Sequence, residues 1–148
     1  MAKNKTDWGT VLVSGLGFND GVGDNPVNLQ SFLSDPVKGD GLVHKASGYH
    51  TFQIHTINFN GNISILATSD AVITPNTDWI PIQLTNTVNG NTANIIPYVF
   101  IPPVPGVPYS SKTIERNDFY TASGQYAWLR ANITDITAGD VPLIKLSF

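Results

Sequence analysis

The feature that most constrains the fold is a regular series of short strand-like segments separated by turn residues, which begins near residue 48. Seven segments are rich in β-branched and aromatic residues: 49–58, 62–68, 78–85, 94–101, 112–121, 125–134 and 141–147. Residues that favour turns separate them at 60–61, 75–76, 89–90, 123–124 and 138–140. This spacing predicts an all-β fold, a β-sandwich or jelly roll of about seven or eight antiparallel strands.

Segment 125–134 indicates most clearly how one strand lies in the sheet. Two sets of side chains alternate along it, Ala127, Leu129, Ala131 and Ile133 against Tyr126, Trp128, Arg130 and Asn132. Because successive side chains of a strand point to opposite faces, the first set predicts the face that packs on the core. The other face then presents two aromatic rings and a guanidinium group, so Tyr126, Trp128 and Arg130 are candidate interface residues.

Residues 1–47 differ in composition and are expected to form an extended arm, with residues 48–148 as the sandwich domain. The arm is rich in Gly, Asp and Asn, and its apolar run at 10–14 predicts one strand. Residues 28–33 are compatible with a helical turn or two, which Pro36 would stop. Strand addition by residues 10–14 to a neighbouring copy would bury apolar side chains that the arm alone leaves in water. The candidate contacts in the arm are Val11, Leu12, Val13, Phe18 and Phe32.

A proline-rich segment, 96–108, interrupts the strand pattern. Its five prolines cannot donate hydrogen bonds to a sheet. Two interpretations are open: the segment covers an edge strand of its own sandwich, or it offers an apolar contact to another subunit. The second interpretation adds Tyr98, Phe100, Val104 and Val107 to the candidate interface.

Composition excludes several classes of protein. Only 13% of the residues are charged, the net charge is -3, and the eight basic residues are scattered, which argues against nucleic-acid binding. No cysteine is present, so the chain has no disulfide and no thiolate. No signal peptide and no apolar run of about 20 residues is found, and we expect assembly in a cytoplasm without a membrane. A neutral surface suits a chain that lies beside copies of itself.

No pattern of catalytic or metal-binding residues stands out, and we expect no enzyme activity, no catalytic residue and no cofactor. Glu115 is the single glutamate, and most aspartates lie in expected turns. A glycosidase requires two carboxylates that face one cleft. His50 and His55 are an odd number of residues apart in one strand, so they should point to opposite faces and share no metal. Asp20 and Asp24 are compatible with a calcium-binding loop, although the twelve-residue EF-hand pattern is absent.

A resemblance adds to this interpretation. The segments are Phe52–His55, Gly61–Asp70, Asp78–Ile82 and Gly124–Ile133. In order they supply a strand, a glycine turn, a strand that ends near an aspartate, a loop to Asp-Trp and a Tyr-x-Trp-Leu-Arg strand. This order resembles small β-sandwich virion proteins of tailed bacteriophages. Two features depart from that pattern, Ala71 in place of a common glycine and the long proline-rich segment.

The resemblance implies a structural subunit of the virion, either a capsid decoration protein or a neck or tail accessory protein. The implied partners are major capsid or neck and tail proteins and further copies of the chain, and the implied location is the virion, assembled in the host cytoplasm. The main alternative is a carbohydrate-binding β-sandwich module, in which Trp8, Trp79 and Trp128 would stack on sugars. A small hydrolase is a third class, but it requires clustered acids that the sequence does not display.

Overall fold

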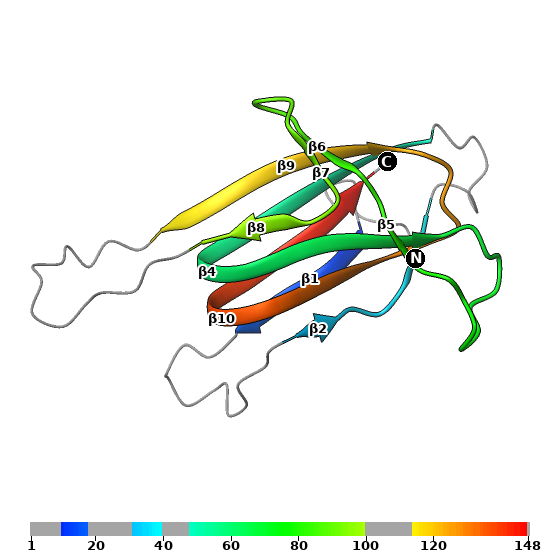
Figure 1. The fold of residues 1–148 in the computed structure, drawn as a ribbon, viewed down its shortest axis with the longest axis horizontal. Helices are drawn as coiled ribbons and strands as arrows, with labels where there is room; N and C mark the ends of the chain where they lie inside the picture. The colour runs from blue at the N-terminus through cyan, green and yellow to red at the C-terminus, as the bar shows by residue number, and fades with distance from the viewer. Residues whose placement is uncertain (1–9, 18–30, 40–47, 100–113, 148) are drawn as a thin grey trace, which may run out of the picture.

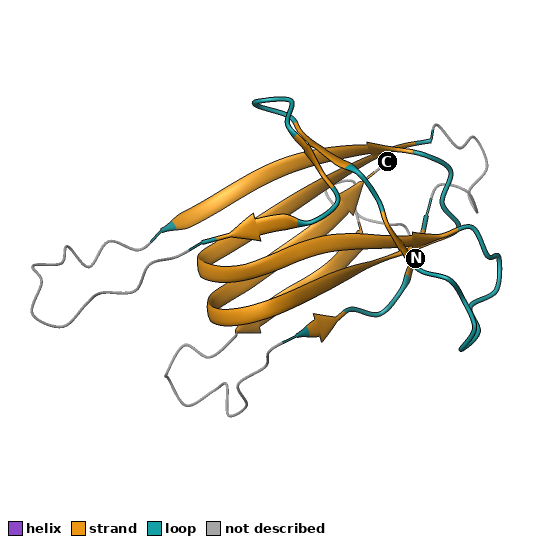
Figure 2. Ribbon diagram, viewed as in Figure 1, coloured by secondary structure: helices purple, strands orange, loops and turns teal. Residues whose placement is uncertain are grey.

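The computed structural model describes residues 10–17, 31–39, 48–99 and 114–147 (Figure 1). This part of the chain consists of strands, turns and loops and contains no helix (Figure 2). All of its strand pairings are antiparallel. The predicted all-β, sandwich-like fold is therefore confirmed.

Two strands of 20 residues each form the centre of the molecule, β4 (Tyr49–Thr68) and β10 (Trp128–Ser147). Two strands of intermediate length are β1 (Thr10–Gly17) and β9 (Glu115–Ser123). The others are short: β2 (Phe32–Leu33), β3 (Val37–Lys38), β5 (Ile80–Pro81), β6 (Leu84–Asn86), β7 (Thr92–Ala93) and β8 (Ile96–Tyr98). The long strands thus set the architecture, and the short ones extend its edges.

Strands β4 and β10 pair along their length and bend together at one end of the molecule (Figure 1). The register between them shifts in the bend, from Thr134 to Leu143 of β10. Asn58 in β4 and Asp135 in β10 have positive φ angles of 50° and 53°. Such bends let one strand pass from one layer of a sandwich to the other.

The bend in β4 also changes which side chains face the core. Alternate residues from His50 to Thr56 are buried at even positions, whereas from Phe59 onward the odd positions are buried. The change of phase coincides with Asn58, whose left-handed backbone turns the strand. Both halves of β4 therefore direct an apolar face toward the same core.

Gly139 explains how the two bends fit against each other. Its φ angle is 88°, and a Cβ atom there would overlap the backbone carbonyl of Asn58. Pro142 lies in the last register shift of β10, where a residue without an N–H group is tolerated. The bends of β4 and β10 are therefore packed backbone against backbone.

The strands form two layers, which share β4 and β10. The first layer joins residues 141–147 of β10 and 49–57 of β4 to β1, β9, β6 and β7. The second layer joins residues 128–134 of β10 and 62–68 of β4 to β2, β3, β5 and β8. One hydrophobic core, with side chains from both halves of β4 and β10, fills the space between them.

Three local predictions need correction. Residues 60–61 and 138–140 do not separate strands, because they lie inside the bends of β4 and β10. Phe32 and Leu33 belong to strand β2, paired with β10, and to no helical turn, because β10 offers them a ladder partner. The strand predicted at 10–14 is confirmed as part of β1, and it pairs with β10 of its own chain.

The described parts of the predicted arm are therefore continuous with the sandwich. β1 lies beside the end of β10, while β2 and β3 lie beside its beginning. These segments use hydrogen-bonding groups of β10 that β4 leaves free, so they extend both layers within one chain. Residues 1–9, 18–30 and 40–47 of the arm lie outside the described residues.

Candidate functional site

The interface residues predicted in β1 divide into one exposed and two buried side chains. Val11 is 46% exposed, whereas Leu12 and Val13 belong to the core. The register with β10 shifts between Val11 and Val13, which marks a β-bulge. A bulge places two consecutive side chains on one side of a strand. The structure therefore leaves only Val11 of these three to contact another molecule.

Tyr98, predicted as a contact, lies in the core at 3% exposure. Its hydroxyl donates to Asp118 Oδ2 at 3.0 Å, and the guanidinium of Arg116 lies 5.1 Å from the centre of its ring. Burial, with the nearby Tyr120 and Asp118, raises the pKa of Tyr98 far above its ordinary value. The hydrogen bond joins β8 of the second layer to β9 of the first, so the position of Tyr98 is structural.

Of the other predicted contacts on the arm and the proline-rich segment, one is described by the structure and four are not. Phe32 is half-buried and packs against the core. Phe18, Phe100, Val104 and Val107 lie outside the described residues. The same is true of the calcium loop at Asp20 and Asp24 and of Trp8.

Two residues of the loop 69–79 contact Trp128 and Arg130 on the outer face of the second layer. Trp79 of this loop stacks on Arg130, whose Cζ atom is 4.2 Å from the centre of the ring. The indole N–H of Trp128 donates to the carbonyl of Ala71 at 3.1 Å. The predicted alternation of faces is confirmed within β10, where Leu129, Ala131 and Ile133 are buried. Tyr126 precedes the strand and packs against the core, so its predicted place on the outer face is wrong. Trp128 and Arg130, however, contact a loop of the same chain, and the sequence did not predict that this loop lies against them.

The outer face of the first layer is open in the described part of the chain. One row of paired residues crosses it from strand to strand: Val11, Lys145, Gln53 and Phe119. Val11 and Phe119 are 46% and 44% exposed. A shallow hollow of about 160 Å³ lies beside the row, lined by Thr51, Gln53, Phe119, Lys145 and Ser147. The row and the hollow thus present uncharged polar and apolar side chains with one lysine.

His55 and Glu115 form a polar pair on the same layer. Their Nε2 and Oε1 atoms are 2.6 Å apart, and both side chains reach solvent. His50 is fully buried, so the two histidines point to opposite faces, as predicted. The described residues contain no group of three side chains suited to hold a metal ion. The contact between His55 and Glu115 is therefore a hydrogen bond at the surface of the first layer.

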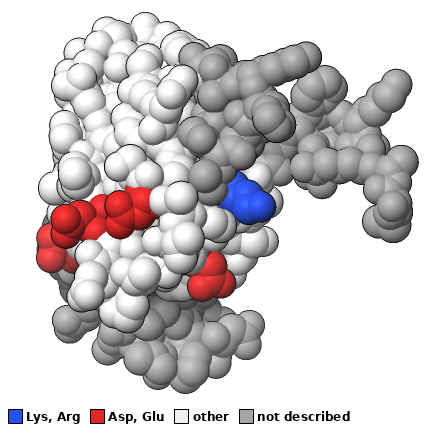
Figure 3. All heavy atoms as spheres, turned by 90° about the vertical axis from the view of Figure 1, so that its right-hand side faces the viewer, with Lys and Arg blue, Asp and Glu red and all other residues white. Residues whose placement is uncertain are grey.

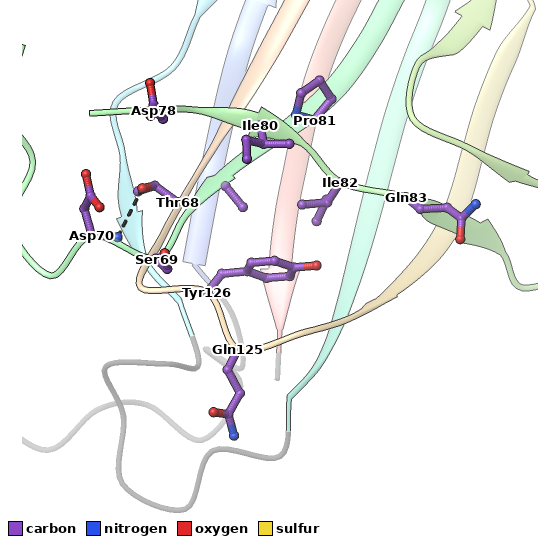
Figure 4. Close-up of a pocket in the computed structure, with 11 residues that line it drawn as sticks. Thr68, Ser69, Asp70, Asp78, Ile80, Pro81, Ile82, Gln83, Gln125 and Tyr126 are labelled. Atoms are coloured by element: carbon purple, nitrogen blue, oxygen red, sulfur yellow. Dashed lines mark hydrogen bonds between the residues drawn. The ribbon is translucent and has the colours of Figure 1, made fainter. Parts of the chain in front are cut away.

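A pocket of about 560 Å³ lies at the end of the sandwich where β4 ends and β10 begins (Figure 4). Its apolar lining consists of Ala67, Ile80, Pro81, Ile82 and the ring of Tyr126. Its polar lining consists of Thr68, Ser69, Asp70, Asp78, Gln83 and Gln125. The sequence predicted Tyr126 as a contact residue, whereas Asp70 followed the predicted strand 62–68, Asp78 began the predicted strand 78–85, and neither received a binding role. The positions of these aspartates, just after one strand and just before the next, were the signal that could have placed them together.

Tyr126 is held firmly in the wall of this pocket. Its hydroxyl donates to the carbonyl of Ser123 at 3.0 Å, and its ring centre lies 5.5 Å from that of His50. Partial burial raises the pKa of Tyr126, so the phenol stays protonated. On the opposite wall, the backbone N–H of Asp70 donates to Oγ1 of Thr68 at 3.1 Å, which fixes the end of β4. The pocket is therefore a formed feature with a rigid rim.

Two further observations concern membrane-spanning helices and similarity to known proteins. The described residues include no helix long and apolar enough to cross a membrane. Comparison with protein-family models, with curated proteins and with solved structures finds no match to this chain.

Proposed function

We propose that the chain is a structural subunit of a tailed-phage virion, either a capsid decoration protein or a neck or tail accessory protein, that acts by binding other protein subunits. The resemblance in 52–82 and 124–133 supports the virion. The observation that carries the binding role is the open outer face of the first layer, crossed by the row Val11, Lys145, Gln53 and Phe119.

The open face has the composition of a contact surface. An antiparallel sheet with one face in water normally alternates apolar residues inside with polar residues outside. Here Val11 and Phe119 interrupt the polar side chains on the outside. Full burial of such side chains by a partner contributes about 1.5–3 kcal/mol for each. With Lys145 as the only charge in the row, a partner has little charge to desolvate.

The alternatives have less support in the described part of the chain. For a carbohydrate-binding module, Trp79 and Trp128 would need free rings, but Trp79 stacks on Arg130 and Trp128 bonds to Ala71. For a hydrolase, one of two paired carboxyls must stay protonated, which usually requires apolar surroundings. The two carboxylates of the pocket, Asp70 and Asp78, are both exposed.

The test measures incorporation into particles of the phage that encodes the chain. Mass spectrometry of purified virions should detect the protein, and Phe119→Glu should lower its copy number at least tenfold, because a carboxylate would be buried in the contact. Val88→Glu is the matched control, since Val88 is 92% exposed on the turn between β6 and β7. Absence of the protein from virions, or equal incorporation of both variants, contradicts the proposal.

A further inference from the structure

The pocket at the end of the sandwich has two chemically different sides. Ile80, Ile82 and the ring of Tyr126 form an apolar side, while Asp70 and Asp78 both lie to the left of these residues in the view (Figure 4). A pair of aspartates alone would be ordinary solvated surface. Beside an apolar wall, in a pocket of about 560 Å³, they form a site within the size range of ligand pockets, roughly 300–1,000 Å³.

The charge of the lining specifies the ligand more closely. Among the described residues of the lining, Asp70 and Asp78 are the only charged ones, so this part of the pocket carries two formal negative charges and no positive one. Figure 3 views the molecule from this end, and the face that it shows carries acidic side chains at the left and lower right and a basic side chain above the lower-right one. A neutral ligand would leave both carboxylates without a counter-charge. A cation would compensate them and gain strong, charge-assisted hydrogen bonds.

We propose that this pocket accepts a lysine or arginine side chain from a partner subunit. The alkyl stem of such a residue lies along Ile80, Ile82 and Tyr126, and its charged head lies between Asp70 and Asp78. Long cationic side chains bury their methylene groups on apolar surface while the head stays near water. The inference rests on the proposed function, because it assumes a protein partner.

The chain contains a comparable arrangement close by. Arg130 packs its guanidinium over Trp79, the residue between Asp78 and Ile80. That cation belongs to the outer face of the second layer and does not line the pocket. An aromatic ring and a cation thus already stabilise the loop that supplies Asp78. We expect the partner's cation to contact the other side of this loop, against Tyr126.

The test is an NMR titration of the full ¹⁵N-labelled chain with n-butylguanidinium and n-butylammonium chlorides at constant ionic strength. We expect saturable shifts at the amides of Asp70, Asp78, Ile80 and Ile82, at concentrations at least fivefold lower than n-butanol requires. The double variant Asp70→Asn with Asp78→Asn should lose this preference for the cation. Asp135→Asn is the control for a change of charge, since Asp135 lies in the distant bend and contacts Asn62.

Several outcomes would overturn the inference. These are no saturable shift with either cation, an undiminished shift in the double variant, an equal response to n-butanol, or a saturable shift at the same amides with maltose or chitobiose. A saccharide response would assign the pocket to glycans. The proposed function is tested separately, by incorporation of Phe119→Glu into virions. A failed pocket titration therefore overturns this inference alone, whereas a failed incorporation test overturns the proposed function whatever the titration shows.

Discussion

The two outer faces of the sandwich differ in what lies against them. On the second layer, the loop 69–79 folds back so that Trp79 stacks on Arg130 and Ala71 accepts a hydrogen bond from Trp128. On the first layer, Val11 and Phe119 remain nearly half exposed, in one row with Lys145 and Gln53. Both faces carry aromatic residues. Among the described residues, a loop of the same chain contacts the aromatic side chains of the second layer, whereas Phe119 of the first layer is left partly exposed.

The difference shows why an aromatic residue on the outside of a strand is ambiguous. The sequence pointed to Trp128 and Arg130 as contacts because they lie opposite Leu129 and Ala131. The structure shows that a loop of the same chain reaches them. Phe119 attracts less notice in the sequence, yet its side chain reaches solvent on a flat sheet. Exposure, rather than residue type, distinguishes the open face of the first layer from the contacted face of the second.

The largest expected effect on the free energy of unfolding comes from disturbing the bends of β4 and β10, since these bends divide the strands into two layers. Gly139→Ala would force a Cβ atom against the backbone of Asn58 at a φ angle of 88°. Left-handed strain and overpacking together should lower the free energy of unfolding by about 2–5 kcal/mol, measured by urea denaturation. Gly15→Ala is the control, because Gly15 also has a positive φ but no atom within 4 Å of an added Cβ. Equal losses in the two variants would show that the contact between the bends is unimportant.

The next effect tests the covered face directly. Trp79→Ala should lower the free energy of unfolding by about 1–3 kcal/mol, since it removes the contact with Arg130 and the apolar area of the indole. Arg130→Met, which keeps the stem and loses the charge, should cost less than Trp79→Ala. Denaturation curves of wild type and variants give both values. A loss near zero for Trp79→Ala would mean that the loop covers this face without stabilising it.

A smaller effect concerns the hydrogen bond that joins the two layers. Tyr98→Phe should cost about 1 kcal/mol at neutral pH, because the donor to Asp118 is lost. Burial raises the folded-state pKa of Tyr98 far above its ordinary value of 10.0. Its contribution is therefore complete below about pH 10 and is lost as the pH rises further, while the unfolded chain ionises.

The pH dependence is measured by thermal unfolding between pH 8 and 11. Wild type should lose stability over this range faster than Tyr98→Phe, so that the two curves converge. Tyr49→Phe is the control, because Tyr49 is 52% exposed. Parallel curves for wild type and Tyr98→Phe would exclude Tyr98 as the source of the alkaline loss.

The smallest expected effect on stability belongs to the open face. Phe119→Ser should change the free energy of unfolding by less than about 1 kcal/mol, since the side chain is 44% exposed. The same substitution should weaken association with the partner subunits, which co-sedimentation with particles measures. A large loss of stability would show that Phe119 belongs to the fold, and the contrast between the two faces would then be wrong.

The sequence predicts the strands better than their connections. The alternation around Leu129 identifies its core face because period-two patterning depends only on local geometry. Asn60-Gly61 and Ala138-Gly139 are turn signals that also suit a bend between layers. Whether such residues end a strand or bend it depends on the strand beside them, and here β4 and β10 bend as a pair.

The pocket is harder to predict from the sequence for a related reason. Asp70 follows one predicted strand and Asp78 begins the next, but only the path of the loop between them brings both to the pocket that Tyr126 lines. Trp79 and Arg130 are likewise separated by 51 positions and meet only in the folded chain. Contacts of this kind depend on tertiary structure that no local pattern encodes.

The pairing of β4 with β10 has a consequence for how fast the chain folds. These strands supply the middle of both layers, yet more than fifty residues separate them, from Thr68 to Trp128. β1, β2 and β3 also need β10 as their partner. Proteins dominated by such distant pairings fold in roughly milliseconds to seconds, because long loops must close before their contacts form. The core can close only after β10 is in place, and until then the edges of β4 stay available to other chains.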